Sequence, residues 1–197
     1  MRKPLLLICI FLSAALCSHA QQISIKGSFF IIPLGEAGTY LGNLGFEYQL
    51  PSSRHTLELN YSMSSWGGIS ADGPSPKRRW VTAAFQRYLG KKEIRNSAFI
   101  SLFAETGNRR IAPGFVHYDG DSILNSERAG EFATGVSLGR NLRLGKHWAI
   151  QSQIGPKIIF ANYTTTYYHS ISSTFTEQKH NEIKAGMRFQ FSFCYQL

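Results

Sequence analysis

The chain has 197 residues and a formal net charge of +9, with 17% charged and 13% aromatic residues. The length suits a single domain. Nucleic-acid-binding domains concentrate many more basic residues on one surface, so this composition argues against a nucleic-acid partner.

The N-terminus has the pattern of an export signal. Arg2 and Lys3 precede an apolar run over residues 5–16, and the small residues of Ser18-His19-Ala20 follow. This pattern predicts a signal peptide over residues 1–20 and a mature domain over residues 21–197. The apolar run is too short for a membrane-spanning helix, which needs about 20 residues.

The three cysteines bear on the type of signal and on disulfide formation. A lipoprotein signal centred on Cys17 is a weaker alternative, because Leu16 stands where such signals carry a small residue. Cleavage after residue 20 would remove Cys9 and Cys17, leaving Cys194 without a partner for an internal disulfide.

The rest of the chain alternates apolar and polar residues with period two, which is typical of strands. The C-terminal segment shows this best, with Ile183, Met187 and Phe191 on one face and Lys184, Arg188 and Ser192 on the other. We expect strands over residues 22–32, 40–50, 55–66, 79–89, 97–106, 130–140, 147–160 and 183–197. Many of these segments reach the roughly 9–11 residues that a tilted membrane strand needs. The sequence therefore predicts an all-β, eight-stranded antiparallel transmembrane β-barrel.

Two strands leave the choice of inward and outward faces open. Residues 79–89 fit either register, and we favour Arg87 facing inward. For residues 97–106 we place Ile100 and Leu102 outward, so that Glu105 points inward. Pro156 is predicted to mark a bulge or a strand edge.

The links between the predicted strands alternate in length. The longer links cover residues 33–38, 67–78, 107–128 and 161–181, and the shorter ones cover residues 51–54, 90–96 and 141–146. Outer-membrane barrels have short periplasmic turns and longer extracellular loops, so both termini are expected in the periplasm. The fourth long link also alternates, so it could extend two strands beyond the membrane as a hairpin.

The predicted inward face carries charges of both signs. The candidates for barrel-interior charges are Glu47, Glu58, Arg87, Glu105, Glu131, Lys157, Lys184 and Arg188. Buried charges are costly unless they are paired, so we expect an ion-pair network that plugs the polar interior. Aromatic residues near strand ends would form interfacial girdles. The candidates for these girdles are Tyr40, Trp66, Trp80, Tyr88, Trp148 and Tyr195. The alternative is a soluble periplasmic sandwich or lipocalin-like barrel, whose apolar face would point inward.

Two stretches carry a resemblance to known families. Residues 77–105 combine a basic and aromatic strand entry, KRRWV, with a short turn and a second strand, and residues 130–163 pair a strand rich in Gly and Ser with the turn LGKHW and another strand. The chain resembles small eight-stranded outer-membrane proteins of the outer-membrane protein A and X type, and more closely the uncharacterised outer-membrane barrel family common in Bacteroidetes. The C-terminal aromatic strand is similar to the signal read by the barrel-assembly machinery. It ends in Leu197 rather than the usual Phe. The resemblance implies an outer-membrane location and supplies no catalytic residues.

Some barrels of this size modify lipid A with His, Ser and acidic groups, and the predicted loops contain such residues. The candidates are His117, Asp119 and Ser122 in the third long link and His169 and Ser170 in the fourth. Ordinary solvated loop residues explain them better, because proximity in sequence does not place a base beside a nucleophile. A metal site built from His117, Asp119 and Asp121 is similarly disfavoured, since such loops are usually turns. We expect no cofactor and no metal.

A basic group lies at the predicted outer rim and could contact lipopolysaccharide phosphates. Its members are Lys77, Arg78, Arg79, Arg109 and Arg110. A merely solvated rim is the equal alternative. Together these features favour a monomeric, non-enzymatic outer-membrane barrel with a structural or surface-interaction role. The alternatives are a lipid A-modifying enzyme and a narrow pore.

Overall fold

The computed structural model describes residues 23–34, 37–51, 54–68, 76–89, 96–118, 121–169 and 174–197. The predicted signal peptide, residues 1–20, lies outside the described residues. Within the described ranges, no helix is long and apolar enough to cross a membrane.

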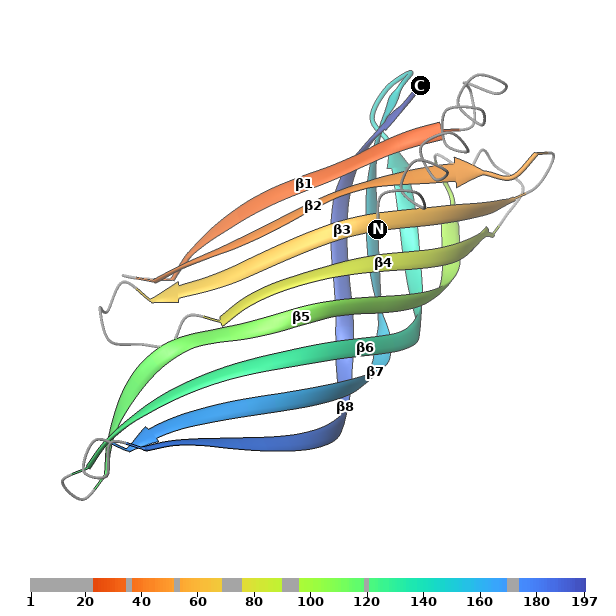
Figure 1. Ribbon diagram of the computed structural model, residues 1–197. Coiled ribbons are helices and arrows are strands. Elements are labelled where there is room, and N and C mark those ends of the chain that lie inside the picture. The colour runs from red at the N-terminus through yellow and green to blue at the C-terminus, as the bar shows by residue number, and fades with distance from the viewer. Residues whose placement is uncertain are drawn as a thin grey trace, which may run out of the picture.

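Eight antiparallel strands form a closed barrel in which each strand pairs with the next and β8 pairs with β1 (Figure 1). The strands are β1 (Ile23–Leu34), β2 (Ala37–Gln49), β3 (His55–Gly68), β4 (Pro76–Tyr88), β5 (Ala98–Tyr118), β6 (Asp121–Arg143), β7 (Trp148–His169) and β8 (Thr174–Gln196). The predicted all-β, eight-stranded antiparallel barrel is therefore confirmed.

The two halves of the barrel have strands of very different length. Strands β1 to β4 contain 12–14 residues, whereas β5 to β8 contain 21–23. In Figure 1 the four long strands run well beyond the ends of the four short ones. The long strands form two extended hairpins, whose last pairs are Tyr118 with Asp121 and His169 with Thr174.

These hairpins change the predicted links. The expectation of a long loop over residues 107–128 is wrong, because β5 and β6 pair through most of it. The fourth link does extend β7 and β8 as a hairpin, as its alternation allowed. The segment 33–38 also contains the end of β1 and the start of β2.

Prolines interrupt two of the long strands in different ways. The β5–β6 register shifts between Ile111 and Gly114, around Pro113. At Pro156 the β6–β7 pairing is interrupted, but the register is the same on both sides, and the pairing with β8 continues. Of the bulge or strand edge expected at Pro156, neither is present, since the strand continues without a register shift; the described register shift lies near Pro113 instead.

The barrel closes through a short seam. The described β1–β8 pairing joins Ser24–Gly27 to Phe193–Gln196, whereas the β7–β8 ladder runs the whole length of β7 and covers β8 from Thr174 to Tyr195. Closure is therefore made near the end of the barrel that holds the C-terminus.

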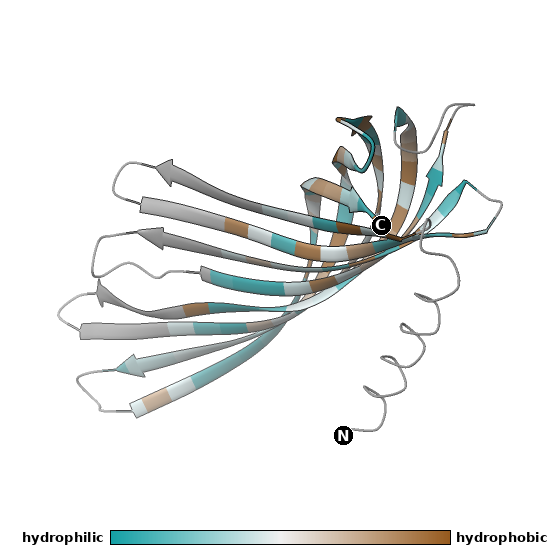
Figure 2. Ribbon diagram, turned by 90° about the horizontal axis from the view of Figure 1, so that it is seen from above, coloured by the Kyte–Doolittle hydropathy of each residue, from teal (hydrophilic) through white to brown (hydrophobic). Residues whose placement is uncertain are grey.

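Apolar side chains of the strands point outward and polar ones point inward. Hydrophobic and hydrophilic residues accordingly alternate along several strands in Figure 2. The exposed large apolar residues on β2 to β8 include Leu44, Phe46, Leu57, Leu59, Val81, Phe85, Ile100, Leu102, Phe132, Val136, Leu138, Ile154, Ile158, Phe160, Ile183, Met187, Phe189 and Phe193. The buried residues include Lys26, Glu58, Gln86, Gln151 and Arg188. A soluble barrel would have the opposite arrangement, since its apolar residues would fill the core.

Candidate functional site

The centre of the barrel interior is organised by Lys26 on β1. Its side chain is fully buried, and its ammonium group donates hydrogen bonds to Glu58 Oε2 and Gln151 Oε1, both at 2.6 Å. It also forms a salt bridge with Glu47. These groups come from β1, β2, β3 and β7, so one cation connects strands on different sides of the barrel.

A second group of charges is linked to this first one by Arg188. The Arg188 guanidinium lies 3.6 Å from Glu58 Oε1 and 3.6 Å from Glu105 Oε1, and Lys157 Nζ lies 2.7 Å from Glu105 Oε2. The guanidinium also lies over the Phe103 ring, 4.3 Å from its centroid. Each of these buried carboxylates therefore faces at least one cation, which offsets the cost of desolvation.

Neutral side chains add further hydrogen bonds to the interior network. The Tyr88 hydroxyl donates to Glu47 Oε1 at 2.7 Å and accepts from Asn141 Nδ2 at 2.9 Å. Gln86 donates to Glu58, and Gln153 bridges Ser137 and Gln190. Amides and hydroxyls thus supply several of the donors and acceptors around the buried charges.

A cavity of about 790 Å³ lies next to this network. Its lining includes Arg78, Trp80, Glu105, Lys157 and Arg188, so charges of both signs and the Trp80 ring face the space. Arg78 lies 5.3 Å from the Trp80 ring and forms a 2.5 Å salt bridge with Glu131. The cavity is therefore lined both by residues of the charged network and by Arg78, one partner of the ion pair with Glu131.

Another ion pair lies further along the extended wall, the part of β5 to β8 that runs beyond the short strands. Arg109 pairs with Glu127 and lies 5.1 Å from the Tyr163 ring. Partial burial opposes the charged form of Arg109, but the hydrogen bond and charge of Glu127 outweigh it and raise the pKa of the guanidinium. Lys184, in contrast, is 39% exposed, pairs with Glu182 at 2.7 Å and lies 5.1 Å from the Tyr163 ring.

On the outside of β4 to β8, the residues lie in rows that run across the sheet. The last mainly apolar row before the extended ends of β5 to β8 contains Val81, Thr106, Phe132, Phe160 and Ile183. These residues are Cα partners from strand to strand. The next outward row contains Arg79, Asn108, Gly130, Asn162 and Asn181. The row after that contains Lys77, Arg110, Arg128, Thr164 and Lys179. The surface therefore changes from apolar to cationic within two rows.

Comparison with known proteins identifies the family but no activity. Residues 5–197 match the family described as "Protein of unknown function (DUF3575)". The chain belongs to this family. No curated protein matches it significantly.

Among solved structures, the fold of this DUF3575 member is similar to that of a major outer membrane protein from Thermus thermophilus. The TM-score is 0.51 at 7% identity, covering 88% of this chain and 98% of that one. The ferric yersiniabactin uptake receptor FyuA from Yersinia pestis matches with a TM-score of 0.36 at 11% identity, covering 80% of this chain and 25% of that one. At such low identity, the Thermus likeness supports the β-barrel fold alone.

The interior of the DUF3575 barrel contains most of the predicted charges, with one error. Glu47, Glu58, Glu105, Lys157 and Arg188 are buried in the network described above. Glu131 faces inward and pairs with Arg78, beyond the buried network. Lys184 lies on the inner side of the extended wall, where it is partly exposed.

The prediction that Arg87 faces inward is wrong. Arg87 is exposed on the outside, where it is the Cα partner of His55 on β3 and Ile100 on β5. The actual register turns Gln86 and Tyr88 inward instead. Tyr88 is only 3% exposed, so its expected place in an outer aromatic girdle is also wrong. Trp80, another girdle candidate, contributes to the inner cavity beside Arg78.

The predicted basic rim divides between the two faces. Lys77, Arg79 and Arg110 are exposed on the outside, whereas Arg78 and Arg109 pair with Glu131 and Glu127 on the inner side. All five residues lie in the same part of β4 and β5, but Arg78 and Arg109 face inward, because neighbouring residues of a strand point to opposite faces.

The loop candidates for catalysis lie partly outside the described residues. Asp119 and Ser170 are not among them, and for His117, Asp121 and Ser122 only the backbone is described, with His117 opposite Ser122 in the β5–β6 ladder. His169 is the Cα partner of Thr174 at the end of β7. Among the described residues, no group of three His, Cys, Asp or Glu side chains is placed to hold a metal ion.

Proposed function

We propose that the protein is a closed, non-enzymatic outer-membrane barrel that acts through the wall formed by the outer parts of β5 to β8. The observation that carries this proposal is the difference in strand length, 21–23 residues in these four strands against 12–14 in β1 to β4. A tilted membrane strand needs about 9–11 residues, so each long strand has about ten residues to spare.

The exposed apolar band supports the membrane location. Phe189 and Ile183 on β8 are 70% and 71% exposed, and Leu138 on β6 and Leu102 on β5 are 61% and 59% exposed. An apolar surface that surrounds a barrel is costly in water and stable in lipid. The band ends where the cationic row begins, as expected at a boundary between lipid tails and headgroups.

The interior network supports a barrel that does not conduct. Lys26, Glu58 and Gln151 meet across the interior from three strands, and an eight-stranded barrel is narrow enough for side chains to fill. We therefore expect no steady ion conductance from the purified protein in planar bilayers. A stable open channel at moderate voltage would contradict this part of the proposal.

The extended wall supports a role in surface contact. Near its tip, the Tyr168 and Phe175 rings lie 4.8 Å apart, and Phe175 is 71% exposed. Thr164 and Thr166 precede Tyr168 on the same face of β7 and are partly exposed. Aromatic rings flanked by hydroxyl groups provide contact area and hydrogen bonds for a partner, and such residues are enriched at interfaces.

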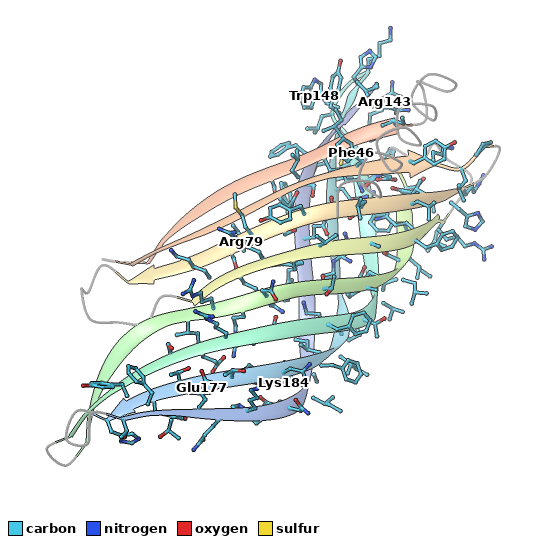
Figure 3. All side chains as sticks on the ribbon, viewed as in Figure 1. Phe46, Arg79, Arg143, Trp148, Glu177 and Lys184 are labelled. Carbon is cyan, nitrogen blue, oxygen red and sulfur yellow. The ribbon has the colours of Figure 1, made fainter. Side chains whose placement is uncertain are left out.

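Thiol labelling of intact cells tests this arrangement. In Figure 3, Glu177, which is close to Phe175 in sequence, lies at the opposite end of the barrel from Arg143 and Trp148. We expect the Phe175→Cys variant to react with a membrane-impermeant maleimide on intact cells. The matched Lys146→Cys variant, in the turn before β7, should react only after permeabilisation. The native Cys194 is buried and should stay unlabelled in both.

Labelling of Lys146→Cys but not of Phe175→Cys on intact cells would reverse the proposed orientation. If neither variant were labelled on intact cells while both were labelled after lysis, the wall would not be at the cell surface.

A further inference from the structure

The cationic rows outside β4 to β8 mark the edge of the apolar band, and their arrangement also fits a specific ligand. Arg79 belongs to the first polar row beyond the apolar band, and Lys77, Arg110 and Arg128 occupy consecutive strands in the second row. Lys179 on β8 continues that row. We call these five residues the cationic belt.

The belt is exposed and has few compensating charges. All five side chains are exposed, and among the described residues none of them takes part in a salt bridge. The acidic residues of the same region, Glu127, Glu131 and Glu182, are paired on the inner side of the wall. Glu177, one row further out beside Thr166, is the exception on the outer side.

The position of the belt fits the headgroup region of a membrane. Lys77 lies four residues before Val81, Arg128 four residues before Phe132, and Lys179 four residues before Ile183, so the offset from the apolar band is the same on each strand. At about 3.3 Å per residue along strands tilted by about 40°, four residues correspond to about 10 Å along the membrane normal.

A hollow on the outer surface crosses the same boundary. It has a volume of about 340 Å³, with Tyr61, Val81 and Thr106 on the apolar side and Arg79 and Asn108 on the polar side. An amphipathic molecule that lies along the barrel would place its acyl part against Val81 and its polar part beside Arg79.

We propose that the cationic belt and this hollow bind the phosphate groups and adjoining acyl chains of a phosphorylated outer-leaflet glycolipid of the lipopolysaccharide type. Neighbouring strands are about 4.8 Å apart, so Lys77, Arg110 and Arg128 span about 10 Å. A lipid with more than one phosphate can engage several of these cations together. Guanidinium groups bind phosphate in a bidentate manner, and three of the five belt residues are arginines. This inference rests on the membrane location proposed above.

The test compares two triple variants of the purified barrel. One replaces Arg79, Arg110 and Arg128 with Gln. The control replaces Arg54, Arg87 and Arg140, three exposed arginines towards the other end of the barrel, with Gln. Both remove three positive charges from the outer surface. Each protein is inserted into phosphatidylcholine vesicles that contain bis-phosphorylated lipid A, dephosphorylated lipid A or phosphatidylglycerol. The lipid retained after extraction in mild detergent is counted by native mass spectrometry.

We expect the wild type and the control variant to retain bis-phosphorylated lipid A and to lose dephosphorylated lipid A. Each cation near an anionic surface contributes about fivefold to binding, so the Arg79, Arg110 and Arg128 variant should retain phosphorylated lipid about 100-fold more weakly. Added salt should weaken the wild-type interaction, because it screens exposed charges.

Equal retention of bis-phosphorylated lipid A by both variants would contradict binding by the cationic belt. Equal retention of phosphatidylglycerol would show a general anionic surface rather than a glycolipid site, and would overturn the proposed ligand. A protein may insert and migrate as a folded barrel on a gel, yet retain bis-phosphorylated and dephosphorylated lipid A equally. That result contradicts this inference alone. A protein that inserts into none of the vesicles contradicts the membrane location as well.

Discussion

Replacing Lys26 with Met removes the cation that faces Glu47 and Glu58 inside the barrel. The two carboxylates are Cα partners on β2 and β3, so they would then face each other with reduced compensation. Glu58 would keep Arg188 at 3.6 Å, whereas Glu47 would keep only neutral donors such as the Tyr88 hydroxyl in the described network. Removing one partner of a buried ion pair typically costs about 3–5 kcal/mol.

Unfolding in urea measures this loss. With a denaturant slope of about 2 kcal/mol per M, we expect the midpoint of the Lys26→Met variant to fall by about 2 M in a vesicle or micelle assay that follows tryptophan fluorescence. The triple variant Lys26→Met, Glu47→Gln, Glu58→Gln removes the whole charge cluster. It should recover most of the loss, because fully neutralised clusters are often as stable as paired ones.

Two results would refute this reasoning. A Lys26→Met variant within about 1 kcal/mol of the wild type would show that the interior is hydrated enough to tolerate unpaired carboxylates. A triple variant no more stable than the single one would show that Lys26 acts through packing rather than through charge.

Three other changes test separate parts of the account. Gly139→Ala places a Cβ 2.1 Å from the Phe99 ring and should cost about 1–3 kcal/mol in urea unfolding, whereas Gly130→Ala, with no atom within 4 Å of its Cβ, should be close to neutral. Arg87→Gln should change stability by less than about 0.5 kcal/mol because Arg87 is exposed, whereas Arg188→Gln should destabilise the protein by several times more; equal effects would contradict the inward–outward assignment. Deleting the gene should leave the lipid A mass spectrum unchanged, and a lost or new modification would contradict the proposed absence of enzymatic activity.

The positions of the strands could be predicted from the sequence wherever lipid and interior impose opposite demands on the two faces. On β8 the alternation of Ile183, Met187 and Phe191 with Lys184 and Arg188 defined the strand and its faces together. Beyond the membrane both faces of a strand can be polar, so the alternation disappears while the hydrogen-bonded ladder continues. For this reason residues 107–128 suggested a loop, although β5 and β6 pair through most of that stretch.

The register of β4 could not be predicted from its own residues. Both of its faces carry apolar and polar side chains, and the correct choice depends on Tyr88 reaching Glu47 on β2 and Asn141 on β6. Arg87 was chosen for the interior because charge usually marks the lumen, but it lies outside the barrel, next to His55 in the ladder.

Lys26 was the main interior residue that the sequence did not single out. It is the one charged residue of the segment QISIKGSFFII. Polar Ser24 and Lys26 alternate there with apolar Ile23 and Ile25, as in a strand. That signal was available, but its importance depends on Glu47, Glu58 and Gln151 converging from three other strands. The pairing of β1, β2 and β3 brings Lys26, Glu47 and Glu58 together, and the closure of the barrel adds Gln151 from β7.

Membrane fractionation followed by gel electrophoresis with and without boiling tests the central claim most directly. A closed barrel of eight strands in the outer membrane should be recovered with the outer-membrane fraction, and the unboiled protein should migrate differently from the boiled protein because the barrel stays folded in detergent. Recovery in the soluble periplasmic fraction, with a mobility that does not depend on boiling, would contradict the membrane-spanning barrel.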